Sequence, residues 1–256
     1  MRRWKRALTI LALLALTALV YFVPQTAQVL SLLQSLQPSV QTTAPSPTAP
    51  IQSVPFDLDA VPAFQGEPWV EINGNIPYFG EEELADPSPE RYSELDEWGR
   101  CGPAFARVSQ EGMPTGEREG IGQYKPSGWH TVRYDDLIDG KYLYNRCHLI
   151  GYQLTGENGE TRNLITGTRY LNIKGMLPYE NKVADYVKTT GNAVLYRVTP
   201  VFQDDELVAR GVLMEAQSVG DGGEGLRFCV YAYNVQPGVD IDYLTGESCR
   251  GCGDGA

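Results

Sequence analysis

Apolar residues follow one another without interruption near the start of the chain. Residues 7–23 carry no charge, four basic residues stand shortly before them, and Pro24 follows. This run lies at the short end of the roughly 17–25 residues that a membrane-spanning helix needs. We therefore expect residues 1–36 to form a basic cytoplasmic flank and one apolar signal-anchor helix, with a cleaved signal peptide as the alternative. In either case the rest of the chain would be exported.

The pattern then changes twice. Residues 37–55 are rich in Pro, Thr, Ser and Gln and contain no charged residue. Such a composition buries too little apolar surface to fold, so it predicts an extended linker. We expect a folded domain over residues 56–247, which is long enough for one hydrophobic core, and a Cys/Gly tail over residues 248–256.

Apolar and polar residues alternate in several short segments of the folded part, as is typical of strands with one buried and one solvated face. These segments are 105–109, 129–134, 142–150, 193–202, 207–218 and 226–235. Helical spacing is found in the middle, at 169–172 and 179–188. Alternation on both sides of the Asn73-Gly74 pair predicts a hairpin over residues 69–79. The fold class we expect is α+β, with a mainly antiparallel sheet and a central helical insert.

The charge is unevenly distributed. The whole chain has a net charge of −11, yet residues 121–200 contain ten Lys and Arg against seven Asp and Glu. An acidic protein is a poor general ligand for nucleic acid, because phosphate binding depends on Lys and Arg. The basic excess in the middle weakens that objection, and we expect weak, salt-sensitive binding of any nucleic acid there.

The chain has five cysteines, an odd number for an exported protein. Cys249 and Cys252 have the CxxC spacing of a redox pair or of half a zinc site. A second CxxC is absent and the chain has only two histidines, so a tail disulfide or free thiols are the preferred interpretation.

Candidate chemistry gathers around His148, which is one of the two histidines and stands two positions after Arg146. A histidine with an ordinary pKa near ~6.5 can remove a proton from water at neutral pH. A divalent cation held by hard oxygen ligands, such as the Asn172 carbonyl, can neutralise charge on a phosphate. Arginine offers a planar fork for the same phosphate, and Glu180 could hold the waters around the cation.

Each of these residues also has an ordinary structural explanation. A histidine on a strand is more often packed than catalytic, an isolated asparagine commonly closes a turn, and Arg146 could belong to an ion pair. Only their joint occurrence in this order favours a nuclease.

Three segments carry a resemblance to a known family. Asn145-Arg-Cys-His148-Leu-Ile-Gly-Tyr, Asn163-Leu-Ile-Thr-Gly-Thr-Arg-Tyr-Leu-Asn172 and Tyr179-Glu180-Asn-Lys-Val183 resemble the DNA/RNA non-specific endonucleases, especially their secreted and surface-attached bacterial members. The resemblance runs from about Trp69 to Gly246. It implies a ββα-metal (His-Me finger) core on the antiparallel sheet.

The resemblance also implies a role for each site residue. By this likeness His148 is the general base and Asn172 is the direct ligand of Mg²⁺. Glu180 supports the metal through water, and Asn163 is a further catalytic asparagine near the site. Arg146 matches the arginine of the Asp-Arg-Gly-His motif, where it contacts phosphate or orients the site.

Two positions depart from that motif. The motif aspartate is Asn145 here and the motif glycine is Cys147. Loss of the aspartate removes a carboxylate that would support neighbouring groups, while the side chain of Cys147 has to pack inward or pair with another cysteine. Neither change touches the base or the metal ligand, so we expect catalysis to be retained.

We therefore expect an exported, Mg²⁺-dependent endonuclease that acts on DNA, with RNA as a further substrate and Mn²⁺ as a substitute metal. We expect the folded domain on the extracellular face of the membrane, held by the N-terminal helix, or secreted if that helix is cleaved. Whether an inhibitor protein accompanies the nuclease is not encoded in this one sequence. The alternative is a catalytically impaired surface module that binds DNA or another polymer. A thiol-redox or zinc protein built on Cys249 and Cys252 is the weaker rival.

Overall fold

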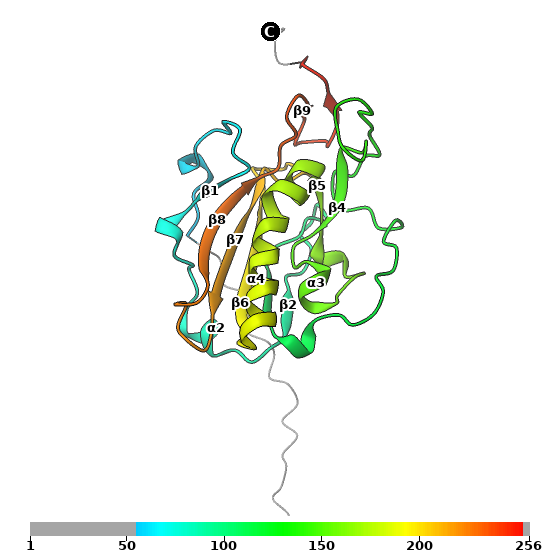
Figure 1. Cartoon of the computed structure of the whole chain (residues 1–256). Coiled ribbons are helices and arrows are strands. Elements are labelled where there is room, and N and C mark those ends of the chain that lie inside the picture. Colours follow the sequence, from blue (N-terminus) through cyan, green and yellow to red (C-terminus); the bar gives the residue numbers. More distant parts are fainter. Residues whose placement is uncertain (1–54, 253–256) are drawn as a thin grey trace, which may run out of the picture. The chain divides into compact units, whose positions relative to one another are not determined.

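The computed structural model describes residues 55–252 (Figure 1). The expected N-terminal helix, and the linker up to residue 54, lie outside the described residues. No helix within residues 55–252 combines the length and the apolar character that crossing a membrane requires.

Six antiparallel strands form the main sheet, in the order β1-β8-β7-β6-β3-β2. Their bounds are Trp69–Glu71 (β1), Glu90–Tyr92 (β2), Ala104–Val108 (β3), Val194–Val201 (β6), Gly211–Ser218 (β7) and Arg227–Tyr233 (β8). The mixed α and β content and the mainly antiparallel sheet confirm the expected class.

The expectation of one solvated face is wrong for the central strands. Nearly every residue of β6, β7 and β8 is buried, because the sheet is covered on both faces. On one face lies the helix α4 (Leu177–Thr190), which crosses the sheet in Figure 1. It turns Tyr179, Val183 and Val187, spaced four residues apart, toward the strands.

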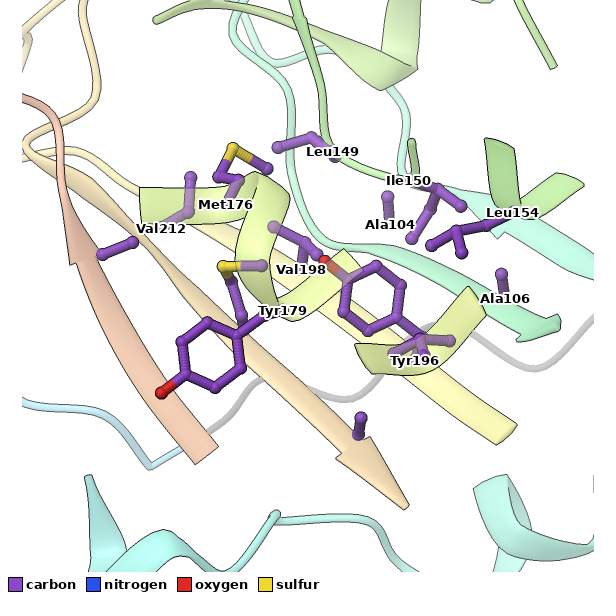
Figure 2. Close-up of a cluster of buried hydrophobic side chains, with 14 of the residues drawn as sticks. Ala104, Ala106, Leu149, Ile150, Leu154, Met176, Tyr179, Tyr196, Val198 and Val212 are labelled. Carbon is purple, nitrogen blue, oxygen red and sulfur yellow. The ribbon is translucent and has the colours of Figure 1, made fainter. Parts of the chain in front are cut away.

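The core between α4 and the sheet is continuous with residues 149–154. Figure 2 shows Tyr179 and Met176 from the helical side together with Tyr196 and Val198 of β6. The same cluster includes residues 149, 150 and 154, which lie between the two strands of the second pair described below. The site that those residues border is therefore fixed to the sheet through packed apolar side chains.

A buried ion cluster lies on the other face. The Arg197 guanidinium is 2.6 Å from a Glu83 oxygen and 2.7 Å from a Glu215 oxygen, and all three side chains are almost fully buried. Glu83 comes from the short helix α2 (Glu81–Ala85). The cluster holds α2 on the sheet, and each charge has a partner, as burial requires.

The hairpin expected over residues 69–79 is not formed. β1 pairs instead with β8, and the Asn-Gly pair lies in the turn η2 (Asn73–Asn75), where Gly74 has φ 59°. The side chain of Asn75 accepts a hydrogen bond from the Cys229 backbone N–H at 2.9 Å. Pairing with the sheet edge therefore replaces the local pairing that the alternation suggested.

A second antiparallel pair stands beside α4 and consists of β4 (Tyr144–His148) and β5 (Leu164–Thr168). The π-helix η5 (Leu171–Met176) follows β5 and runs directly into α4, so the two helices expected from the sequence form one continuous run. Residues 129–134 do not form a strand; they contribute only the isolated bridge between Arg133 and Tyr142. This ββα unit carries the candidate site.

The remaining elements are short. They are η1 (Leu58–Ala60), η3 (Gln110–Gly112), α3 (Tyr152–Thr155), η4 (Thr161–Asn163), β9 (Asp240–Ile241) and β10 (Ser248–Cys249). Cys249 and Cys252 form a disulfide, one of the two outcomes expected for this CxxC. The other three cysteines are free and buried.

Candidate active site

A cavity of about 300 Å³ opens where β4 ends and the helical run begins. Four of the five residues expected at the site line it, and the fifth, Asn163, does not. Its polar lining is formed by Arg118, Arg146, His148, Gln153, Asn172 and Glu180.

His148 is the last residue of β4 and is only 7% exposed. Its Nδ1 lies 3.1 Å from the Arg118 Nη2, and its Nε2 lies 3.0 Å from the Asn158 carbonyl oxygen. A guanidinium can only donate, so Nδ1 accepts and Nε2 carries the proton that it donates to Asn158. Burial lowers the pKa of His148 to about 4, and the Arg118 charge acts in the same direction. The imidazole is therefore neutral at neutral pH, and its Nδ1 lone pair accepts the hydrogen bond from Arg118.

Arg118 was not anticipated from the sequence. It lies in the loop between η3 and β4, and its Nε donates to the Asn158 side-chain oxygen at 3.0 Å. None of the ion pairs among residues 55–252 includes it. Flanked by Glu117 and Glu119, it has the local pattern of an ordinary solvated loop charge. Only the fold places it against the imidazole.

Arg146 uses its guanidinium to hold the same loop. Its Nε donates to the Tyr124 carbonyl, its Nη2 donates to the Gly122 carbonyl at 2.6 Å, and its guanidinium carbon lies 4.0 Å from the centre of the Trp129 ring. These contacts are of the orienting kind, one of the two roles that the resemblance left open.

Asn172 is the second residue of η5 and lines the cavity. Its Nδ2 donates to the Asn145 Oδ1 at 3.1 Å. This bond occupies the donor end of the Asn172 amide, so the carbonyl oxygen is the end left for a ligand. Asn145, the position of the missing motif aspartate, therefore contacts the expected metal ligand directly.

Glu180 enters the cavity from the first turn of α4 and is 9% exposed. Burial raises the pKa of its carboxyl group to about 7, while a hydrogen bond from Gln153 opposes the shift. No ion pair within the described part of the chain includes this carboxyl group. A Cβ on Gly151 would lie 2.7 Å from its Oε2, so only glycine leaves room for the carboxyl group in this position.

These residues fit a magnesium ion. The Asn172 carbonyl and the Glu180 carboxylate are hard oxygen donors of the kind that Mg²⁺ prefers. A buried carboxylate outside any ion pair of the described residues is electrostatically costly even with the Arg118 charge acting on it, and a bound cation would relieve that cost. The donor set therefore matches the metal that the resemblance implies.

Asn163 lies beside the site instead of within it, and its side chain is fully buried. Its Oδ1 accepts from the Ile150 backbone N–H at 2.8 Å, and its Nδ2 donates to the Ile150 carbonyl at 3.0 Å. The backbone N–H of Leu149 donates to the Asn163 carbonyl at 2.9 Å. Asn163 thus fixes the chain that directly follows His148, and both ends of its amide are already bonded.

Cys147 packs inward, one of the two outcomes expected for it. It is fully buried, and its Sγ occupies the space where a Cβ on Gly167 would approach within 2.3 Å. Burial raises the pKa of this thiol well above its usual value, so it is not a nucleophile at neutral pH. His130 lies outside the cavity, with its Nε2 3.0 Å from the Thr245 carbonyl oxygen.

Among residues 55–252 one further group of metal-ligand type is found where β9 meets the tail. Asp240, Cys249 and Cys252 bring their ligand atoms within 4.8 Å of one another. Both sulfurs are in the disulfide, so neither is the thiolate that zinc binding needs. The structure does not support the zinc interpretation of this CxxC.

Comparison with known proteins shows similarity to nucleases. The family model described as DNA/RNA non-specific endonuclease matches residues 82–220. A deoxyribonuclease of Streptococcus dysgalactiae subsp. equisimilis is 34% identical over 110 residues, which are 41% of this chain and 32% of that protein. The chain thus matches about a third of the length of this relative.

Among solved structures, NucA from Streptococcus agalactiae with a magnesium ion bound is 25% identical, with a TM-score of 0.65 over 75% of this chain and 93% of that one. The Sda1 nuclease with a bound zinc ion is 30% identical, with a TM-score of 0.56 over 63% of this chain and 81% of that one.

Proposed function

The chain belongs to the DNA/RNA non-specific endonuclease family, and we propose that it is a Mg²⁺-dependent endonuclease that hydrolyses phosphodiester bonds of DNA with little sequence preference. RNA has the same phosphodiester linkage and is the second substrate in this proposal. The observation that carries it is the cavity that joins a neutral, buried His148 to the Asn172 carbonyl and the Glu180 carboxyl group.

In this mechanism His148 removes a proton from the attacking water. The imidazole is suited to the task because its pKa of about 4 keeps it unprotonated at neutral pH. Nε2 keeps its proton and donates it in a hydrogen bond to the Asn158 carbonyl, which fixes the ring and leaves Nδ1 as the basic atom. A positioned general base of this kind contributes roughly 10²–10⁴-fold to a rate.

Arg118 has to leave Nδ1 before that atom can accept a proton. We assign Arg118 the role of binding the phosphate at the scissile bond, because a guanidinium binds phosphate through two parallel N–H groups. When it turns from the imidazole to the phosphate, substrate binding frees the base. Arg146 keeps the loop that carries Arg118 in place through its hydrogen bonds to the Gly122 and Tyr124 carbonyls, so only the Arg118 side chain has to move.

Asn172 and Glu180 would hold the Mg²⁺, with Glu180 acting through water. The chemistry that the ion supplies when bound is neutralisation of charge on the phosphate and on the departing oxygen. Asn163 acts as a positioning residue, because its two bonds to Ile150 fix the backbone that follows the base.

Cleavage of supercoiled plasmid by the purified full-length chain tests the function. We expect nicked and then linear DNA with Mg²⁺ and with Mn²⁺, and intact plasmid with EDTA. Labelled RNA of mixed sequence tests the second substrate in the same buffer. Binding of the plasmid without cleavage, in the presence of either metal, would favour the polymer-binding module instead.

We further propose that the chain is exported through its N-terminal apolar segment, which stays attached as an anchor. The support is the basic flank followed by the uncharged run of residues 7–23. Fractionation of cells that express the full chain tests this point. Full-length protein in the membrane fraction fits the anchor, a shortened soluble form outside the cell fits a cleaved signal, and a full-length soluble form inside the cell contradicts export.

A further inference from the structure

The side-chain amides of Asn145 and Asn172 face each other across the ββα unit. Asn145 lies in β4, where it pairs with Gly167 of β5, and Asn172 follows β5 in η5. The single bond between them runs from the Asn172 Nδ2 to the Asn145 Oδ1 over 3.1 Å. Within residues 55–252 neither amide group forms another hydrogen bond.

A carboxamide has a donor end and an acceptor end of almost the same shape. If both amides turn by 180°, the pair keeps one hydrogen bond but reverses its direction. Asn145 then donates, the Asn172 oxygen accepts, and the Asn172 NH₂ group faces the cavity. An NH₂ group cannot bind a cation, so only one of the two arrangements is competent for metal.

We propose that Asn145 is a positioning residue whose Oδ1 holds the donor end of the Asn172 amide and thereby keeps the Asn172 oxygen at the catalytic cavity. The inference rests on the proposed function, because it takes Asn172 as a metal ligand. A carboxylate at position 145 has acceptors only. It would force Asn172 to donate to it and would keep the Asn172 oxygen at the cavity.

A reversed amide lowers the apparent metal affinity by the fraction of molecules in the competent arrangement. An Asn172 amide without a partner has two equally populated arrangements, for which this factor is about two. An Asp at position 145 excludes the reversed arrangement and adds a negative charge close to the cation, so we expect its metal affinity to rise by about 3–10-fold. A Leu of similar size bonds to neither end of the Asn172 amide, so that amide turns freely and the metal affinity should fall about twofold.

The experiment measures Mn²⁺ affinity by electron paramagnetic resonance on the full-length chain, without substrate. The variants are Asn145→Asp and Asn145→Leu, with thermal unfolding of each to verify folding; Asn145→Ala replaces the Leu variant if that one does not fold. The expected order of affinity is Asp above the natural Asn, and Asn above Leu. As a second readout, the Mg²⁺ concentration at half-maximal cleavage should follow the same order.

The comparison between Asn and Leu separates orientation from charge, because both side chains are neutral. Equal affinity of the natural chain and Asn145→Leu overturns the proposal, even if Asn145→Asp binds more tightly, since charge alone would then explain the gain. Asn172→Ala distinguishes this failure from a failure of the proposed function. Unchanged Mn²⁺ affinity in Asn172→Ala would mean that Asn172 is not the ligand at all.

Discussion

Gly151→Ala should remove most of the nuclease activity without unfolding the protein. The added Cβ would lie 2.7 Å from the Glu180 Oε2 and 2.8 Å from the carboxyl carbon. Ordinary contact begins near ~3.4 Å, so the carboxyl group has to retreat by roughly 0.7 Å. A displacement of about 1 Å in a positioned group can cost about 10²-fold in rate. We therefore expect cleavage to slow by roughly 10–100-fold, together with a higher Mg²⁺ requirement.

The fold should tolerate the same substitution. Gly151 has φ −59°, a backbone conformation that alanine adopts freely. The atoms that must move are the far end of a flexible side chain, so we expect the free energy of unfolding to change by less than about 1 kcal/mol.

Gly112→Ala is the matched control, because the Cβ that it adds would meet only the Ser109 hydroxyl, at an ordinary 3.7 Å. Both variants and the natural chain are compared by plasmid cleavage over a Mg²⁺ series and by thermal unfolding. If Gly151→Ala keeps its rate and its Mg²⁺ requirement within twofold of Gly112→Ala, the close approach of Glu180 has no functional role and the reasoning is wrong.

Two further substitutions test other contacts. Burial is the main cause of the low pKa of His148, and the Arg118 charge lowers it further. Arg118→Gln removes only the charge, so the acid limb of the kcat/KM profile should move upward from near pH 4; an acid limb at an unchanged pH contradicts the contact. Asn163→Ala leaves two buried backbone groups without partners, which should cost about 3 kcal/mol and lower the thermal midpoint by roughly 6–12 °C. An unchanged midpoint in a melting experiment would contradict that role.

The regular part of the fold follows from local pattern. β4 and α4 stand close to where alternation and helical spacing place them, because each element buries the face that its spacing defines. The hairpin over residues 69–79 fails for the opposite reason. Apolar and polar residues do alternate there, but the segment pairs with β8, which buries the same residues against the main sheet. A local sequence pattern cannot indicate a partner strand so far away in the chain.

The candidate site also contains residues that the sequence predicts and contacts that only the structure shows. His148, Asn172 and Glu180 could be found because their residue types and order resemble a family motif, and one cavity brings them together. The loop position of Arg118 has no periodicity from which its place could be inferred. The bond between Asn145 and Asn172 depends on the registration of β4 with the start of η5, which only the folded chain reveals.

The most direct test of the proposed mechanism compares His148→Ala with His130→Ala, the same substitution at the chain's other histidine, outside the cavity. Full-length proteins are assayed for plasmid cleavage at pH 7 with Mg²⁺. We expect His148→Ala to lose roughly 10²–10⁴-fold in rate, while His130→Ala stays within a few-fold of the natural chain. A His148→Ala rate within a few-fold of the natural chain would show that the imidazole is not the base.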